Sequence, residues 1–252
     1  MVSGTSATPY TGTLLDRCGV ALNYHNITHP SLPNYIAATS GAVQGAAATT
    51  DCEPSACPQR QPSLFEEVQA AGLEWREYVQ SPQGICAASP AAFYPSLAPH
   101  CAEWEASLGT PAAGALRSDL NTGHLAAFTF LLPDGAHDMA EGADQFLSDW
   151  VPAITASPEY RAGRVALLIT WDEGGTNRVP GETCGDMAHA DPVNFPGCQV
   201  AFIALGPATG GVHSTAYFNH YSLLRTTAEM IGLSANLGAA AHATSMRAAL
   251  HL

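Results

Sequence analysis

The sequence predicts an α/β domain whose mostly parallel central sheet carries helices on both faces. Three short, almost continuous apolar runs occupy residues 125–132, 164–171 and 199–205. Runs of this kind are typical of strands that are buried on both faces, as in a parallel sheet. A helical pattern over about 141–157 separates the first two runs. Alternation of strand and helix indicates an α/β domain with right-handed crossovers.

Local signals define the elements that precede these runs. Residues 9–18 begin with Pro9 and carry apolar residues at roughly helical spacing, which predicts a short helix that Gly19 ends. Residues 20–27 alternate enough to form a strand. A helix is expected after Pro33, because proline is favoured in a first helical turn.

The middle of the chain is less regular. Residues 42–61 are small, polar and Pro-rich, which predicts a loop. Residues 62–72 predict a helix that stops at its terminal glycine, and 73–79 predict a strand at a half-exposed edge of the sheet. Residues 80–124 are rich in Pro, Cys and small residues, and we expect a loop-rich cap or insertion there. A late helix is expected over 217–232.

The composition bounds the class of protein. The 252 residues are 46% apolar, which suits one sizeable domain or at most two, and we expect a single domain over 1–252. Charged residues make up only 12% of the chain, all nine basic residues are Arg, and the net charge is -13. This charge argues against nucleic-acid binding, which needs a basic surface. No apolar run is long enough for a transmembrane segment. An anionic substrate would require a local cation, and nothing here indicates an oligomeric state.

The cysteines indicate an exported protein. None of the seven forms a C-x-x-C motif, and several lie in loop-like sequence, which is typical of disulfides in an oxidising compartment. We therefore expect a secreted or periplasmic protein, although the chain opens without a secretory signal. Proximity favours three pairs and leaves Cys18 unpaired, while the sequence does not fix connectivity: Cys52–Cys57, Cys86–Cys101 and Cys184–Cys198.

Polar residues follow several predicted strands, where the sites of open α/β sheets lie. The first predicted strand leads to Ser31. Asp134 and His137 follow the run at 125–132, and Asp172 and Glu173 end the run at 164–171. The sequence therefore brings a hydroxyl, a histidine and carboxylates towards one rim.

Each of these residues also has an ordinary structural explanation. Ser31 could be a helix N-cap, and the Asp172–Glu173 pair could cap a helix or lie in a solvated turn. Asp134 could orient His137 or cap the next helix. Together they favour a site, because adjacent carboxylates repel one another unless a cation lies between them.

Four segments carry a family resemblance. His29-Pro-Ser-Leu-Pro-Asn-Tyr-Ile36 resembles the nucleophile segment of the phosphoesterase family of bacterial acid phosphatases and phospholipases C, in the alkaline-phosphatase-like superfamily. The segment 169–175 resembles that family's apolar strand ending in Asp-Glu, and 133–137 resembles its Pro-Asp-x-x-His segment. Residues 217–229 resemble a late helix of the acid-phosphatase branch.

The resemblance implies hydrolysis of a phosphate ester through a phosphoserine at Ser31. The substrate would be a small phosphate monoester or diester, or a phospholipid head group. The implied cofactor is one divalent metal ion, either Mg, Mn, Ca or Zn, which would lower the pKa of the serine. Ser31, Asp172, Glu173 and Asp134 are its expected ligands. Asn34 is expected to donate to a phosphate oxygen and His137 to assist the leaving group, and His220 is a further candidate for substrate contact.

The resemblance also implies a difference from the family. Its members begin with an apolar strand that ends in Glu-Asn and supplies two more metal ligands, upstream of the region matching residues 3–10. We therefore expect this chain to be truncated at its N-terminus. That expectation motivates an alternative, a non-catalytic relative that binds an anionic ligand or partner through a depleted metal site. A serine carboxylesterase is disfavoured, since no G-x-S-x-G motif occurs.

Overall fold

The structure is a computed structural model of the 252-residue chain, and it describes residues 7–43, 45–80, 84, 86–89, 91–98, 100–174 and 198–252. The first elements along the chain are α1 (Pro9–Arg17), β1 (Gly19–Ala21), β2 (Tyr24–His25), α2 (Ser31–Ser40), η1 (Gly45–Ala48), α3 (Leu64–Ala70) and β3 (Trp75–Val79). The next are η2 (Pro95–Leu97), α4 (Cys101–Trp104), β4 (Glu105–Ser107), α5 (Ala115–Thr122), β5 (Phe128–Leu132), α6 (Ala140–Thr155) and α7 (Pro158–Arg161). The last are β6 (Leu167–Thr170), β7 (Phe202–Leu205), β8 (His213–Ser214), β9 (Phe218–Asn219), α8 (His220–Met230), η4 (Gly238–His242) and α9 (Arg247–Leu250).

The strands form three sheets. One has the order β4-β3-β5 and is parallel throughout. A second has the order β6-β7-β1-β8, in which β1 is parallel to β8 while β7 is antiparallel to both β6 and β1. The third is the parallel pair β2-β9. The predicted α/β class, with parallel pairing and helices on both faces, is confirmed.

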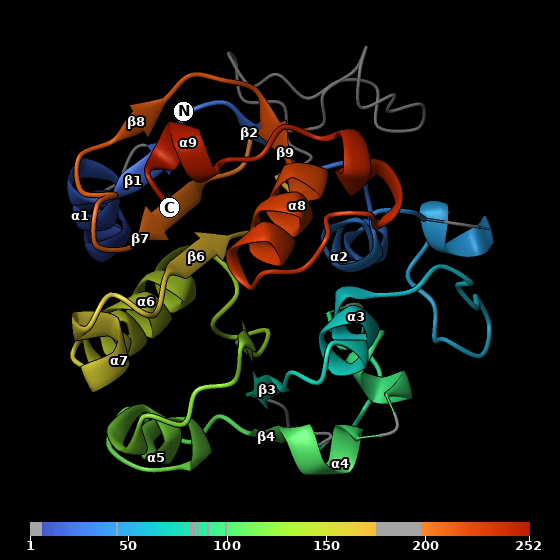
Figure 1. Ribbon diagram of the computed structural model, residues 1–252, viewed down its shortest axis with the longest axis horizontal. Coiled ribbons are helices and arrows are strands. Elements are labelled where there is room, and N and C mark those ends of the chain that lie inside the picture. Colours follow the sequence, from blue (N-terminus) through green and yellow to red (C-terminus); the bar gives the residue numbers. More distant parts are fainter. Residues whose placement is uncertain are drawn as a thin grey trace.

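One buried layer joins the two larger sheets. Side chains from α1, α5 and α6 form a single cluster with Tyr78 of β3 and with Ile203 and Leu205 of β7. On the opposite faces, α2, α3 and α8 pack against Trp75 of β3, and α9 packs against Phe202 of β7. Helices α2 and α8, far apart in the sequence, lie side by side (Figure 1). The core is therefore that of a helix-covered sheet layer.

Three expectations differ from the structure in detail. The run at 199–205 yields β7, which runs antiparallel to β6, and the run at 125–132 yields β5 in a different sheet from β6. Continuous apolarity reports burial on both faces and carries no information on strand direction. The strand over 73–79 is the middle strand β3 and not a half-exposed edge, because β4 lies beside it. That neighbour and α5 both come from the predicted loop-rich segment 80–124.

Local chemistry explains several helix boundaries. Ser63 and Glu66 form a capping box at the start of α3, in which each side chain meets the other's backbone N–H. Asn219 caps α8 by accepting from two backbone N–H groups of its first turn. Helix α2 ends at Gly41, whose φ is +73° and whose missing Cβ would lie 2.3 Å from the carbonyl oxygen of Leu237. Only glycine fits that approach.

Two of the expected cysteine pairs are disulfides. Cys52 is bonded to Cys57 and Cys86 to Cys101. Cys18 is a half-buried free thiol. The third expected pair is not tested, because Cys184 lies outside the described residues. Among the helices that the structure describes, none has the length and apolarity needed to cross a bilayer.

Candidate active site

Helix α2 presents Ser31 at its first position. The N-cap is Pro30 and makes no side-chain capping bond, so Ser31 is not the helix cap that its sequence context allowed. The Ser31 hydroxyl instead lies close enough to the carboxylate of Asp172 to lower the pKa of that carboxylate. A serine at the start of α2 and one of the carboxylates predicted from the sequence, at the end of β6, are therefore close together.

Asn34 holds the loop that leads to this serine. Its side-chain oxygen accepts from the N–H groups of Ile27 and Thr28, at 2.8 and 3.1 Å. Its amide donates to the carbonyls of Thr28 and Pro30, at 2.8 and 3.1 Å. The side chain is buried, and these four bonds use both of its N–H groups. In this arrangement Asn34 has no free hydrogen for a phosphate oxygen, so its predicted substrate contact would require one of these bonds to break.

The end of β6 carries the carboxylate pair. Burial raises the pKa of Asp172, the nearby Ser31 hydroxyl lowers it, and the charge of Glu173 raises it again. Nδ1 of His29 lies 2.5 Å from Oε2 of Glu173. Gly174 follows with no room for a side chain, since a Cβ there would lie 2.6 Å from that of Cys198. The chain is thus held closely on both sides of Glu173.

His220 lies behind Asp172, at the start of α8. Its Nε2 meets the backbone carbonyl oxygen of Asp172 at 2.6 Å, and its Nδ1 meets the hydroxyl of Tyr24 at 2.8 Å. Burial lowers the pKa of His220 to about 4, so the ring is neutral at pH 7. Both ring nitrogens are engaged and the side chain is buried. The structure therefore places His220 where it supports the carboxylate pair, with no nitrogen left to face a substrate.

His137 and Asp134 share a tight turn after β5. Asp134 Oδ1 lies 2.6 Å from Nδ1 of His137 and accepts a hydrogen bond of 3.0 Å from the N–H of Ala136. The contact with His137 lowers the pKa of Asp134. Helix α6 begins with Met139 as its N-cap and has no capping side chain, so Asp134 contacts His137 and does not cap that helix. The other ring nitrogen of His137 remains available on a partly exposed side chain.

Residues that were not singled out from the sequence link these segments. The indole N–H of Trp171 donates to the carbonyl of Asp138 at 2.8 Å, which ties the His137 turn to the end of β6. Asp51 Oδ1 accepts the backbone N–H of Leu32 at 2.8 Å, beside Ser31. Burial, and then the charges of Asp172, Asp138, Glu173 and Asp51, raise the pKa of Tyr35. Tyr35 lies within the nucleophile motif, whereas nothing in the loop sequence marked Asp51.

The predicted metal ligands are brought together in part. Asp172 lies close to Ser31 and directly precedes Glu173 in the chain, while the contacts of Asp134 are with His137 and the turn. Among the described residues, it is a different group of His, Cys, Asp or Glu side chains, three in number, that has its ligand atoms within 4.8 Å of one another. It consists of Cys86, Cys101 and Glu105, and its two cysteines form a disulfide.

The chemistry of the donor set nevertheless fits a hard divalent cation. Two neighbouring carboxylates and a hydroxyl offer oxygen ligands. No arginine of the described residues forms an ion pair with either carboxylate, and the chain has no lysine. Oε2 of Glu173 is shielded from solvent and accepts no hydrogen bond from a described residue. Negative charge without a nearby fixed cation is the condition in which metal binding is favoured.

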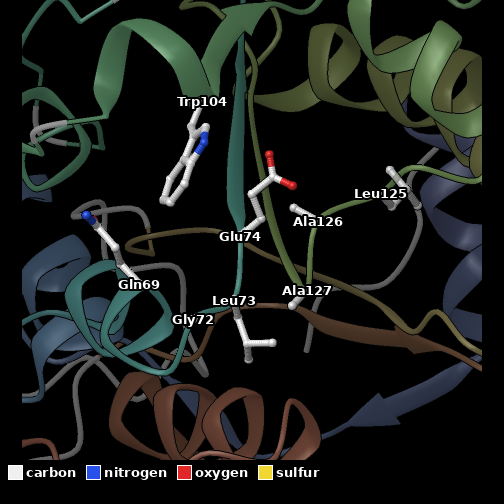
Figure 2. A pocket seen from close by; sticks show the side chains of 8 residues that line it. All are labelled: Gln69, Gly72, Leu73, Glu74, Trp104, Leu125, Ala126 and Ala127. Carbon is white, nitrogen blue, oxygen red and sulfur yellow. The ribbon is translucent and has the colours of Figure 1, made fainter.

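Two cavities flank the three-stranded sheet. One of about 490 Å³ lies at the amino ends of β3 and β5, and Figure 2 shows Trp104, Gln69 and Leu125 around it. None of its lining residues was predicted to be functional. The other, of about 420 Å³, lies at the carboxyl ends of the same strands and is lined in part by Asp134. Ligands of α/β sheets bind at carboxyl ends, but of the predicted site residues this second cavity is lined by Asp134 alone.

Comparisons with known proteins bear on the family and the fold of the chain. The model of the Phosphoesterase family matches residues 4–234. No curated protein sequence matches the chain. A solved protein of the alkaline phosphatase superfamily from Vibrio parahaemolyticus aligns with a TM-score of 0.55 at 13% identity, over 90% of this chain and 61% of that one. Ps i-CgsB, solved in complex with k-i-k-neocarrahexaose, aligns with a TM-score of 0.55 at 11% identity, over 96% of this chain and 70% of that one. The chain thus spans less than two thirds of the Vibrio protein, and these likenesses show the fold alone.

Proposed function

Since the chain belongs to the Phosphoesterase family, we propose that it hydrolyses phosphate esters with Ser31 as the nucleophile. The observation that carries the proposal is the proximity of the Ser31 hydroxyl, at the start of α2, to the Asp172 carboxylate, whose pKa it lowers. A helix start offers backbone N–H groups and a positive dipole end to an anion. A serine oriented there by a carboxylate is well placed to attack phosphorus.

The residues of the site suit a two-step transfer. Ser31 Oγ forms a bond to phosphorus while the bond to the leaving oxygen breaks, and the hydroxyl proton passes to water. His137, oriented by Asp134, donates a proton to the leaving oxygen. A water molecule then attacks the phosphoserine and releases phosphate, which restores the serine. Asn34 fixes the loop before Ser31, and His220 fixes the backbone of Asp172.

Ser31, Asp172 and Glu173 would hold one divalent ion, of Mg, Mn, Ca or Zn, with Asp134 as a further candidate ligand. When bound, such an ion supplies positive charge that lowers the pKa of the serine hydroxyl and offsets the charge of the phosphate. This arrangement would let an acidic chain with a net charge of -13 accept an anionic substrate.

The substrate would be a small phosphate monoester or diester, or a phospholipid head group. Two disulfides are consistent with an extracellular protein, and we place the enzyme outside the cytoplasm, secreted or in a periplasm.

A comparison of Ser31→Ala with the unchanged chain tests the proposal. Turnover of p-nitrophenyl phosphate and bis-p-nitrophenyl phosphate is measured with each of the four metals, with Ser118→Ala on exposed α5 as the control. We expect a loss of about a thousandfold or more for Ser31→Ala and none for Ser118→Ala. Mass spectrometry of acid-quenched enzyme should find phosphate on the Ser31 peptide.

Unchanged turnover in Ser31→Ala would rule out the nucleophile. If the unchanged chain binds phosphate or vanadate but turns over neither ester, the non-catalytic alternative is favoured instead.

A further inference from the structure

His29 connects the nucleophile segment to the carboxylate pair. It stands two residues before Ser31, and its Nδ1 lies 2.5 Å from Oε2 of Glu173. The His29 side chain is 12% exposed, so water has little access to the contact. Oε2 has no other polar partner among the described residues, so His29 is the polar group in contact with this oxygen. No role for His29 in the proposed reaction follows from the residues already considered.

The surroundings of the His29 ring determine which of its nitrogens makes the strong polar contact. The other nitrogen, Nε2, faces the sulfur of Cys198 at 3.6 Å, which is a weakly polar neighbour. Nδ1 is therefore the atom that makes the strong contact. The backbone of this segment is itself restrained, because Asn34 bonds to Thr28 on one side of His29 and to Pro30 on the other. A ring carried by a restrained loop can hold a carboxylate in one place.

We propose that His29 is a positioning residue that holds Glu173 from the nucleophile segment and so sets Glu173 and Ser31 relative to one another. The inference rests on the proposed function, because Glu173 matters here as a metal ligand. With Nδ1 against Oε2, the carboxylate is held in one orientation, and its other oxygen would be the one left to bind a divalent ion. Groups that orient metal ligands typically change metal affinity by 10- to 100-fold when they are removed.

Three substitutions separate this role from a merely structural one. The side-chain amide of asparagine lies at the position of Nδ1, so His29→Asn keeps a donor against Glu173. The amide of glutamine lies closer to the position of Nε2, so His29→Gln has similar size but a misplaced donor. His29→Ala has no donor at all. The two amides are close in polarity, and a difference between them reports donor position. His213→Gln, on an exposed residue of β8, is the control.

The test measures the binding of Mg, Mn, Ca and Zn to the full chain by titration calorimetry, together with the metal dependence of turnover. Thermal unfolding confirms that each variant is folded. We expect His29→Asn to bind the preferred metal within about threefold of the unchanged chain, and His29→Gln and His29→Ala to bind it at least tenfold more weakly. Excess metal should restore much of the turnover in His29→Gln.

Other outcomes overturn the inference. Unchanged affinity in His29→Gln would show that His29 does not position Glu173. An equal loss in all three variants would show that donor position is irrelevant. If the unchanged chain binds no divalent ion, the metal part of the proposed function fails. If it binds metal and hydrolyses phosphate esters while His29→Gln matches it, only the inference about His29 fails.

Discussion

The indole N–H of Trp171 donates a hydrogen bond of 2.8 Å to the backbone carbonyl of Asp138. Trp171 directly precedes the carboxylate pair at the end of β6, and Asp138 directly follows His137. This bond therefore ties the turn that carries His137 to the segment that carries the carboxylate pair. The two segments follow strands of different sheets, β5 and β6, so no backbone hydrogen bonds between paired strands connect them.

Trp171→Phe should separate geometry from stability. Phenylalanine keeps an aromatic ring but has no N–H, so the His137 turn loses its tie to β6. We expect the free energy of unfolding to fall by about 1 kcal/mol, the usual net value of one hydrogen bond. We expect kcat to fall by roughly tenfold, since small displacements of catalytic groups have large effects. Urea denaturation and steady-state kinetics give both numbers.

Trp104→Phe is the control, because Trp104 lines the cavity at the opposite end of the sheet. It should leave kcat unchanged. A Trp171→Phe variant with full kcat would show that this bond has no part in catalysis.

Asn34→Asp distinguishes a loop-holding residue from a phosphate donor. Aspartate can still accept from Ile27 and Thr28, but it presents a carboxylate to the carbonyls of Thr28 and Pro30 in a buried position. We expect the free energy of unfolding to fall by roughly 3 kcal/mol, because buried polar groups lose their partners. Urea denaturation is compared with that of Asn121→Asp, an exposed position on α5. Full stability combined with lost activity would favour the substrate contact that the motif predicts.

Local chemistry made much of this fold predictable. The helix containing Phe146 and Trp150 was expected from its apolar face, and both side chains are buried in α6. The strand ends were also predictable, since polar residues follow apolar runs. Strand direction was not, because a buried strand has the same composition whichever way it runs. The sequence also predicts that β3 lies at an edge of the sheet, and this prediction is wrong. Its partner β4 begins at Glu105, 26 residues after β3 ends at Val79, so the pairing is not a local feature of the sequence.

The candidate site was predictable only where its residues belong to a motif. Ser31 and the Asp172–Glu173 pair were found in that way. Asp51 was not, because it contacts Leu32 from a loop 19 residues away, and loop sequences carry no periodic signal. The engagement of His220 with Tyr24 is likewise a tertiary contact between residues 196 apart.

Glu77 and Glu105 should make stability depend on pH. They lie opposite one another on β3 and β4, and both are buried. Burial, reinforced by the charge of Glu105, holds the pKa of Glu77 well above its usual range. The folded chain therefore keeps the Glu77 proton at pH values where the unfolded chain releases it. Unfolding then releases a proton, so stability falls as the pH rises above about 4.5.

Glu77→Gln should remove the Glu77 contribution to this dependence, because glutamine is neutral at all pH values and can donate to Glu105. We expect the variant to equal the unchanged chain near pH 4 and to be the more stable of the two near pH 8. The difference should grow by at most about 1.4 kcal/mol per pH unit. Chemical denaturation across this range measures it, with exposed Glu141→Gln as the control. Parallel pH profiles for Glu77→Gln and the unchanged chain would contradict the assignment of the proton to Glu77.

Asp51→Asn should change which phosphate ester the site prefers. The Asp51 carboxylate accepts the N–H of Leu32 in the first turn of α2, one residue from Ser31, and it adds to the negative charge of Asp172 and Glu173. A monoester carries up to two negative charges near neutral pH and a diester carries one, so this carboxylate should disfavour the monoester more. Asparagine keeps an oxygen for Leu32 and removes the charge.

We expect kcat/KM for p-nitrophenyl phosphate to rise by roughly 3- to 10-fold relative to bis-p-nitrophenyl phosphate, a shift that matches the interaction of partly screened charges. Asp16→Asn, exposed at the far end of α1, should leave the ratio of the two substrates unchanged. The effect should also shrink in high salt, because exposed charges are screened. An unaltered ratio in Asp51→Asn would mean that Asp51 serves the backbone of α2 alone.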